Sequence, residues 1–162
     1  MESEPFLAWP ESHALKRNLA LSLLVAVLFI LVFGGASLIT GTHAMRWRVH
    51  TDWELGLPLL APFTAVYLSL NLVMGLAPWV LRTKEDFLPL IKVMTAELFI
   101  AGTIFLIFPA ELRFPPPVID GFWAPFLLTA DTLNLDYNLL PSLHVAFALS
   151  VAYHLAALGA MG

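Results

Sequence analysis

The chain alternates between long apolar runs and short polar connections, a pattern that predicts membrane-spanning helices. A helix that crosses a bilayer requires about 20 mostly apolar residues. Four stretches reach that length, at residues 19–39, 57–81, 88–108 and 141–161. We therefore predict an all-α fold: a polytopic membrane helical bundle with four transmembrane helices, which form one transmembrane domain over residues 1–162.

The connection between the third and fourth runs, residues 109–140, is much longer than a turn. It contains three consecutive prolines, Pro115 to Pro117, which prevent a continuous helix. The apolar patch at residues 122–128 is too short to cross a bilayer. We expect this patch to lie in the membrane interface or to fold back on the bundle.

Composition agrees with a membrane protein and excludes several other classes. Hydrophobic residues make up 59% of the chain and charged residues only 12%, whereas a soluble domain is about one quarter charged. The chain has no cysteine, which excludes disulfides and thiolate metal sites. The net charge is −4 and there is no basic block, so nucleic acid is not an expected partner.

Lysine and arginine positions predict how the bundle is oriented. The membrane side that holds the N-terminus has five basic residues near the span ends: Lys16, Arg17, Arg82, Lys84 and Lys92. The opposite side has three: Arg46, Arg48 and Arg113. Basic residues favour the cytoplasmic side of a membrane. This bias places the N-terminus in the cytoplasm, and the long loop and the start of the fourth helix on the extracytoplasmic face.

The sequence Pro141-Ser-Leu-His144 opens the fourth apolar run and combines groups that suit a phosphate. Proline is favoured at the first helical position. The next backbone amides, including that of Leu143, have no partner inside the helix and attract an anion. Ser142 adds a hydroxyl donor, and His144 adds an imidazole that can protonate a leaving oxygen. The alternative interpretation is a helix start with a serine and an interfacial histidine.

Residues 138–147 also resemble the second signature of the type 2 phosphatidic acid phosphatase superfamily, in particular its inositol phosphorylceramide synthase branch. Two looser similarities accompany this segment. The first consists of Asp52-Trp53, Leu57-Pro58 and Pro62, followed by a predicted helix that contains Tyr67. The second consists of Phe108-Pro109, followed by Arg113 and Pro115. The resemblance extends over roughly residues 50–160 and is specific at Pro141–His144.

The resemblance implies a six-helix membrane enzyme that cleaves or transfers phosphate esters of lipids without a metal or another cofactor. Its expected partners are a lipid phosphate substrate and membrane lipids. His144 matches the histidine that protonates the leaving alkoxide, and Ser142 matches a residue that holds a phosphate oxygen. Arg113 is the candidate for the phosphate-binding arginine of the first signature. The lysine expected seven residues earlier is Leu106 here, so an ordinary interfacial arginine is the alternative.

The third signature of the family, with its histidine nucleophile and orienting aspartate, does not occur in the 162 residues. His154 cannot replace that nucleophile, because it lies about 15 Å further along the helix than His144. We expect this chain to be the N-terminal part of the six-helix enzyme. The alternative is a relative that lost its nucleophile and acts as a membrane scaffold or a lipid-phosphate-binding protein.

Three other polar residues lie inside the predicted spans, where ionisable groups are functional candidates. Glu97, His154 and Asn71 fall at a similar depth, so we predict a structural polar cluster, with a proton relay as the alternative. Asp131 and Asp136 precede His144, but their spacing matches no compact metal site. We therefore predict no metal.

Overall fold

Every named regular element in the described part of the chain is a helix. The computed structural model describes residues 11–111, 120–133 and 138–161, and these ranges contain no β-strand. In chain order the elements are α1 (Ser12–Phe29), η1 (Ile30–Gly34), α2 (Gly35–Gly41), η2 (Glu54–Gly56), α3 (Phe63–Val80), α4 (Lys84–Ile107), α5 (Ala124–Leu133) and α6 (Leu143–Met161).

Several of these helices have the length and composition of membrane spans. Ser12–Gly41, Phe63–Val80 and Lys84–Ile107 are each long and apolar enough to cross a bilayer. Within α6, the stretch Leu143–Ala157 is apolar but shorter. The predicted all-α membrane bundle is therefore confirmed.

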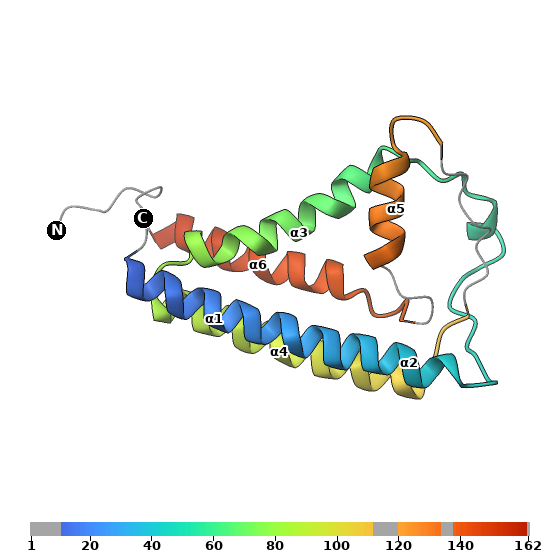
Figure 1. The fold of residues 1–162 in the computed structure, drawn as a ribbon, viewed down its shortest axis with the longest axis horizontal. Coiled ribbons are helices and arrows are strands. Elements are labelled where there is room, and N and C mark those ends of the chain that lie inside the picture. Colours follow the sequence, from blue (N-terminus) through green and yellow to red (C-terminus); the bar gives the residue numbers. More distant parts are fainter. Residues whose placement is uncertain (1–10, 112–119, 134–137, 162) are drawn as a thin grey trace.

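The long helices lie roughly along one axis in alternating directions (Figure 1). α1 and α4 run side by side in one direction, while α3 and α6 return in the other. Helix α4 contacts α1 and α6, and α3 contacts α1 and α6. The start of α6 therefore lies at the end of the bundle where α2 and α4 finish and α3 begins.

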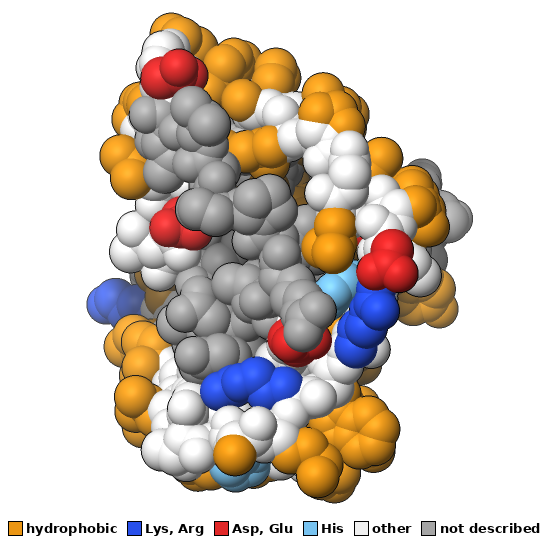
Figure 2. All heavy atoms as spheres, turned by 90° about the vertical axis from the view of Figure 1, so that its right-hand side faces the viewer, with side chains coloured by type: hydrophobic (Ala, Val, Ile, Leu, Met, Phe, Trp, Pro, Cys, Tyr) orange, Lys and Arg blue, Asp and Glu red, His pale blue; other side chains and the backbone are white. Residues whose placement is uncertain are grey.

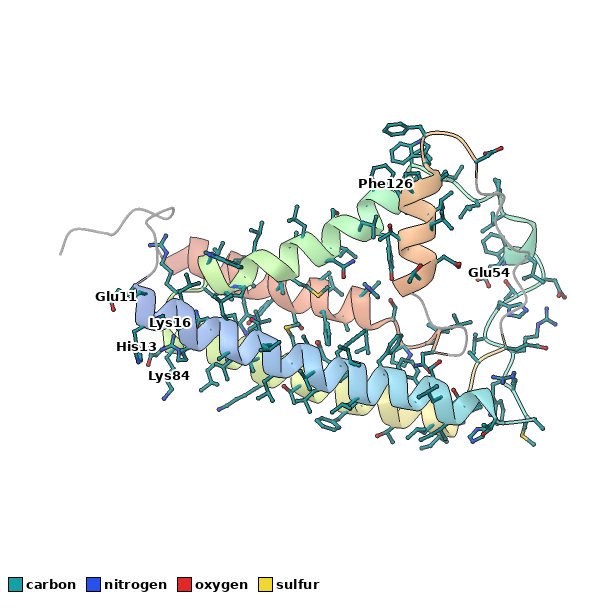
Figure 3. The ribbon with its side chains drawn as sticks, in the orientation of Figure 1. Glu11, His13, Lys16, Glu54, Lys84 and Phe126 are labelled. Atoms are coloured by element: carbon teal, nitrogen blue, oxygen red, sulfur yellow. The ribbon has the colours of Figure 1, made fainter. Side chains whose placement is uncertain are left out.

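The two ends of the bundle carry different segments. Glu11, His13, Lys16 and Lys84 gather where α1 and α4 begin, whereas Glu54 and Phe126 lie at the opposite end (Figure 3). The second end holds the segment between α2 and α3 and helix α5. Helix α5 packs against α3, so the apolar patch that begins at Phe122 folds back on the bundle, one of the two expected placements.

The helix starts have local chemical causes that shift them from the predicted spans. The second span begins at Phe63 rather than at residue 57, because Pro58 and Pro62 precede it and a proline interrupts helical hydrogen bonding. Helix α4 begins at Lys84 rather than at residue 88. The Thr83 hydroxyl accepts a hydrogen bond from the Asp86 amide at 3.1 Å and so caps its first turn.

Helix α4 supplies the central face of the core. Its buried residues follow one another at spacings of one, three or four positions and are Phe87, Leu90, Ile91, Met94, Leu98, Ala101, Gly102 and Phe105. The buried side chains of α6 that join the same core are Leu143, Phe147 and Val151. This spacing places one apolar stripe of each helix against its neighbours.

The first long helix contains a π-helical turn, η1, between α1 and α2. The chain passes α4 closely here, because a Cβ added to Gly102 would overlap Cγ1 of Val32. Phe33 is buried in the same turn and packs edge-on against Phe105 of α4, with ring centroids 5.7 Å apart. Glycine at position 102 therefore permits the close approach of the two helices.

Asn18 joins α1 to the end of α3. Its side chain is fully buried, and its amide nitrogen donates to the carbonyls of Leu81 at 2.7 Å and Pro78 at 3.3 Å. Its carbonyl oxygen accepts from the Arg17 guanidinium at 2.9 Å. The last carbonyls of a helix have no intrahelical donor, so this contact satisfies acceptors that are buried in the bundle.

The segments that follow α2 and α4 pair at the other end. The amide of Trp47 donates to the carbonyl of Pro109 at 2.8 Å, and the amide of Glu111 donates to the carbonyl of Trp47 at 2.9 Å. The Trp47 ring packs edge-on against Phe108. This short pairing holds the two connecting segments together at the end of the bundle where α6 begins.

Candidate functional site

The first turn of α6 is stabilised by the residue that precedes it. The hydroxyl oxygen of Ser142 accepts a hydrogen bond from the Val145 amide at 3.4 Å, and the Ser142 carbonyl accepts from the Ala146 amide at 3.0 Å. Ser142 is therefore the N-cap, and the helix begins at Leu143 rather than at residue 141. Because the hydroxyl oxygen accepts in this contact, its own proton stays able to donate.

Neighbouring residues of this turn point in different directions. Ser142 is exposed, His144 is half-buried, and the Leu143 side chain is buried in the core. Leu143 can therefore contact a ligand at the open end of the helix through its backbone amide, but not through its side chain. The burial of its side chain fixes the rotation of α6 and so sets where Ser142 and His144 lie.

His144 contacts Tyr67 of α3, which lies 77 positions earlier in the chain. The phenolic oxygen is 3.0 Å from Nε2 and 3.3 Å from Nδ1, and the ring centroids are 4.6 Å apart. A neutral imidazole can accept the phenolic proton, and a protonated one can donate to the phenolic oxygen. The contact therefore holds the imidazole in either protonation state.

The segment that leads into α6 is tied to the π-helical turn of the first helix. Asn138 is buried, and its side-chain nitrogen donates to the carbonyl of Phe33 at 2.7 Å. On the other side of His144, Phe147 packs near Phe29 with ring centroids 6.3 Å apart. The start of α6 is thus held against the first helix both before and after His144.

A cavity of about 470 Å³ opens between α1, α3, α4 and α6. His144 and Phe147 line it from α6, and nearly all the other lining residues are apolar. The polar exceptions are Ser22, Asn71 and His144. One side of His144 therefore faces an apolar space, although the residue belongs to the polar motif at the start of α6.

Glu97 and His154 are connected through Ser150. The Ser150 hydroxyl donates to Glu97 Oε1 at 2.7 Å, and Nδ1 of His154 donates to the Ser150 carbonyl at 2.7 Å. Glu97 Oε2 is buried without a hydrogen-bond partner in the part of the chain that the structure describes. Asn71 lines the cavity, and its buried side-chain nitrogen likewise has no partner within residues 11–111, 120–133 and 138–161.

Two arginines in the segment after α2, at the end of the bundle where α6 begins, are engaged by protein groups. Arg46 donates to the carbonyls of Thr40 at 3.2 Å and Gly41 at 3.3 Å, which caps the end of α2. Arg48 pairs with Asp52. Figure 2 shows basic, acidic and histidine side chains together on this end of the molecule. Arg113 and Asp136 lie outside the described residues, and Asp131 lies on α5.

No candidate metal centre accompanies the motif. Within the described ranges, no group of three or more histidine, cysteine, aspartate or glutamate side chains is arranged to hold a metal ion. The polar groups placed at the start of α6 are a hydroxyl, backbone amides and an imidazole, which suit an anion better than a cation.

Sequence reasoning missed the contacts that are made by distant residues. The sequence pointed to Tyr67 only through the family resemblance. A tyrosine inside an apolar span is itself a signal that a polar partner is near. Ser150 was missed, and its position one helical turn before His154 was the available signal. The bond of Asn138 to Phe33 leaves no signal in the sequence, because the two residues are 105 positions apart.

Comparison with known proteins adds no assignment. No protein-family model, curated protein or solved structure matches this chain.

Proposed function

We propose that this chain binds the phosphate of a membrane lipid at the start of α6, and that His144 is the general acid of a lipid phosphatase or phosphotransferase. The observation that carries the proposal is the contact between Tyr67 and His144. Both residues belong to segments that resemble the type 2 phosphatidic acid phosphatase superfamily, and they meet beside the exposed Ser142. Meeting of two such distant segments supports a shared site.

The proposed reaction uses each group for one task. A nucleophile attacks phosphorus, the bond between phosphorus and the leaving oxygen breaks, and His144 gives its proton to that oxygen. The Ser142 hydroxyl and the amides of Leu143 and His144 donate hydrogen bonds to the phosphoryl oxygens. Tyr67 orients the imidazole. Water as the final acceptor makes the protein a phosphatase, and an alcohol makes it a transferase.

The nucleophile is assigned to no residue of this chain, because the 162 residues contain no third signature. A second candidate function is a lipid-phosphate-binding membrane protein without turnover, which would use the same hydroxyl, amides and imidazole at the start of α6. The two functions share the pocket and differ in the chemical step. Turnover of phosphatidic acid by the full reading frame in membranes, lost on His144→Ala, would select the enzyme. Binding with no turnover would select the second function.

Binding is the property to measure on the 162 residues. The chain is placed in phosphatidylcholine nanodiscs and titrated with phosphatidic acid. His144→Ala should weaken binding about tenfold, which corresponds to the loss of one hydrogen bond to a charged group. His13→Ala is the matched control, because His13 is exposed at the opposite end of the bundle (Figure 3). Equal affinity of the two variants would contradict the proposal.

A second pair of variants separates the capping role of Ser142 from ligand binding. Aspartate is as good an N-cap as serine, whereas alanine is poor. Ser142→Asp should keep the thermal stability of the chain but abolish phosphatidic acid binding, because it places a negative charge against the phosphate. Ser142→Ala should cost about 1 kcal/mol of stability. If Ser142→Asp binds phosphatidic acid normally, Ser142 is a helix cap and nothing more.

A further inference from the structure

We infer that the cavity between α1, α3, α4 and α6 binds one hydrocarbon chain of a membrane lipid, with the head group of that lipid at the start of α6. The cavity has a volume of about 470 Å³, which is within the usual range for ligand sites. The inference rests on the proposed function only for the identity of the head group. The hydrocarbon site itself is argued from the lining.

The lining excludes a charged or strongly polar occupant. Among the residues that the structure describes, no aspartate, glutamate, lysine or arginine lines the cavity, and the polar lining residues are Ser22, Asn71 and His144. A buried charge or polar group without a partner is costly. An apolar cavity also tends to stay free of water. Because the surrounding solvent of a membrane protein is lipid, a hydrocarbon chain is the available ligand that matches these walls.

The cavity is large enough for a hydrocarbon chain. A dry apolar cavity of about 150 Å³ already binds benzene. This cavity, at about 470 Å³, is roughly three times as large.

The cavity reaches the segment Pro141–His144, where the phosphate is proposed to bind. On the first long helix the lining runs from Ser22 of α1 to Ile30, the first residue of η1, which is about 12 Å of helix. On α6 the lining consists of His144 and Phe147, in the first turns of that helix. His144 therefore belongs both to the cavity and to the polar start of α6. A lipid with its phosphate at Ser142 has a direct path for one chain into the cavity.

Gly75 of α3 leaves open space on the α3 side of the cavity. It lines the cavity, and a Cβ added to it would have no neighbouring atom within 4 Å. A large side chain at this position has room to enter the cavity without displacing the backbone. Gly35 offers a matched control, because its Cβ position is equally open and it does not line the cavity.

The test uses a hexadecanol derivative with a photoreactive diazirine in mid-chain, which carries no phosphate. The full 162-residue chain is irradiated in phosphatidylcholine nanodiscs, and labelled residues are mapped by mass spectrometry. Labelling is expected at Val25, Phe29, Leu90 and Met94 and should be displaced by unlabelled hexadecanol. Gly75→Phe should abolish labelling at these four residues, whereas Gly35→Phe should leave it unchanged.

The result separates this inference from the proposed function. Labelling confined to lipid-facing residues such as Leu23 and Leu38, and equal in all variants, would overturn the hydrocarbon site. A wild-type chain with no labelling in the cavity would overturn it too. If cavity labelling is found but His144→Ala leaves phosphatidic acid binding intact, the hydrocarbon site stands and the proposed function fails.

Discussion

The side-chain nitrogens of Asn18, which is buried, and of Asn71, which is half-buried, are in opposite hydrogen-bonding situations. The side-chain nitrogen of Asn18 donates to two carbonyls at the end of α3. The corresponding nitrogen of Asn71 has no partner in the ranges that the structure describes. Removal of a hydrogen-bonded polar group lowers stability, because its partners are then left unpaired. Removal of a buried polar group that has no partner instead relieves a desolvation penalty.

Replacement of each asparagine by leucine tests this difference at constant size. Asn18→Leu should lower the free energy of unfolding by about 1–3 kcal/mol, because the carbonyls of Pro78 and Leu81 lose their donor. Asn71→Leu should be neutral or stabilising. Unfolding in mixed detergent, followed by circular dichroism, measures both. A loss of similar size in the two variants would mean that Asn71 has a partner of its own.

Close approach of two helices is decided at Gly102. This glycine of α4 faces Val32 in the π-helical turn of the first helix, and there is no room for a Cβ between them. Valine is stiff because two carbon atoms branch from its Cβ, so it cannot easily move aside. The contact therefore sets the distance between the two helices, and through them the position of Phe33 and Asn138.

A double-mutant cycle tests this contact. Gly102→Ala should destabilise the bundle by about 1–3 kcal/mol through overpacking. Combination with Val32→Ala should recover part of that loss, because the second change removes the atom that the new methyl group meets. Each variant is compared by its unfolding free energy in detergent. Strictly additive losses would show that the helices separate freely at this point.

The whole molecule has two polar ends, and the proposed site lies at only one of them. The segment after α2, helix α5 and the start of α6 share that end (Figure 1), whereas α1 and α4 begin at the other. Basic residues are in excess at the end where α1 and α4 begin. This excess predicts that the site, at the opposite end, faces away from the cytoplasm. This orientation determines from which leaflet a lipid phosphate can reach His144.

The absence of native cysteine allows the orientation to be measured directly. Single cysteines are placed at Asp52, Asp120, Glu11 and Lys84, which are all exposed. A membrane-impermeant maleimide added to intact cells should label the first two and spare the others. The reverse pattern would place the site in the cytoplasm. Labelling of Asp52→Cys without Asp120→Cys would contradict the arrangement in which both segments share one end.

Local features of the site were predictable, and distant contacts were not. Ser142 and His144 were placed at a helix start because the proline before them and the apolar run after them act within a few residues. The partner of His144 was not predictable, since Tyr67 is brought to it by the packing of α3 against α6. Likewise Glu97 and His154 were expected to share one cluster, and Ser150 is the residue that connects them.

The sequence by itself determined the elements of this protein: which segments are apolar helices, roughly where each begins and that the whole is a membrane bundle. These properties follow from composition and from capping groups close in the chain. Tertiary structure alone decided which polar side chains meet and where the cavity opens. The physical reason is that a helix apolar on all sides carries no pattern that sets its rotation about its axis. Packing contacts such as those of Leu143 and Gly102 set that rotation.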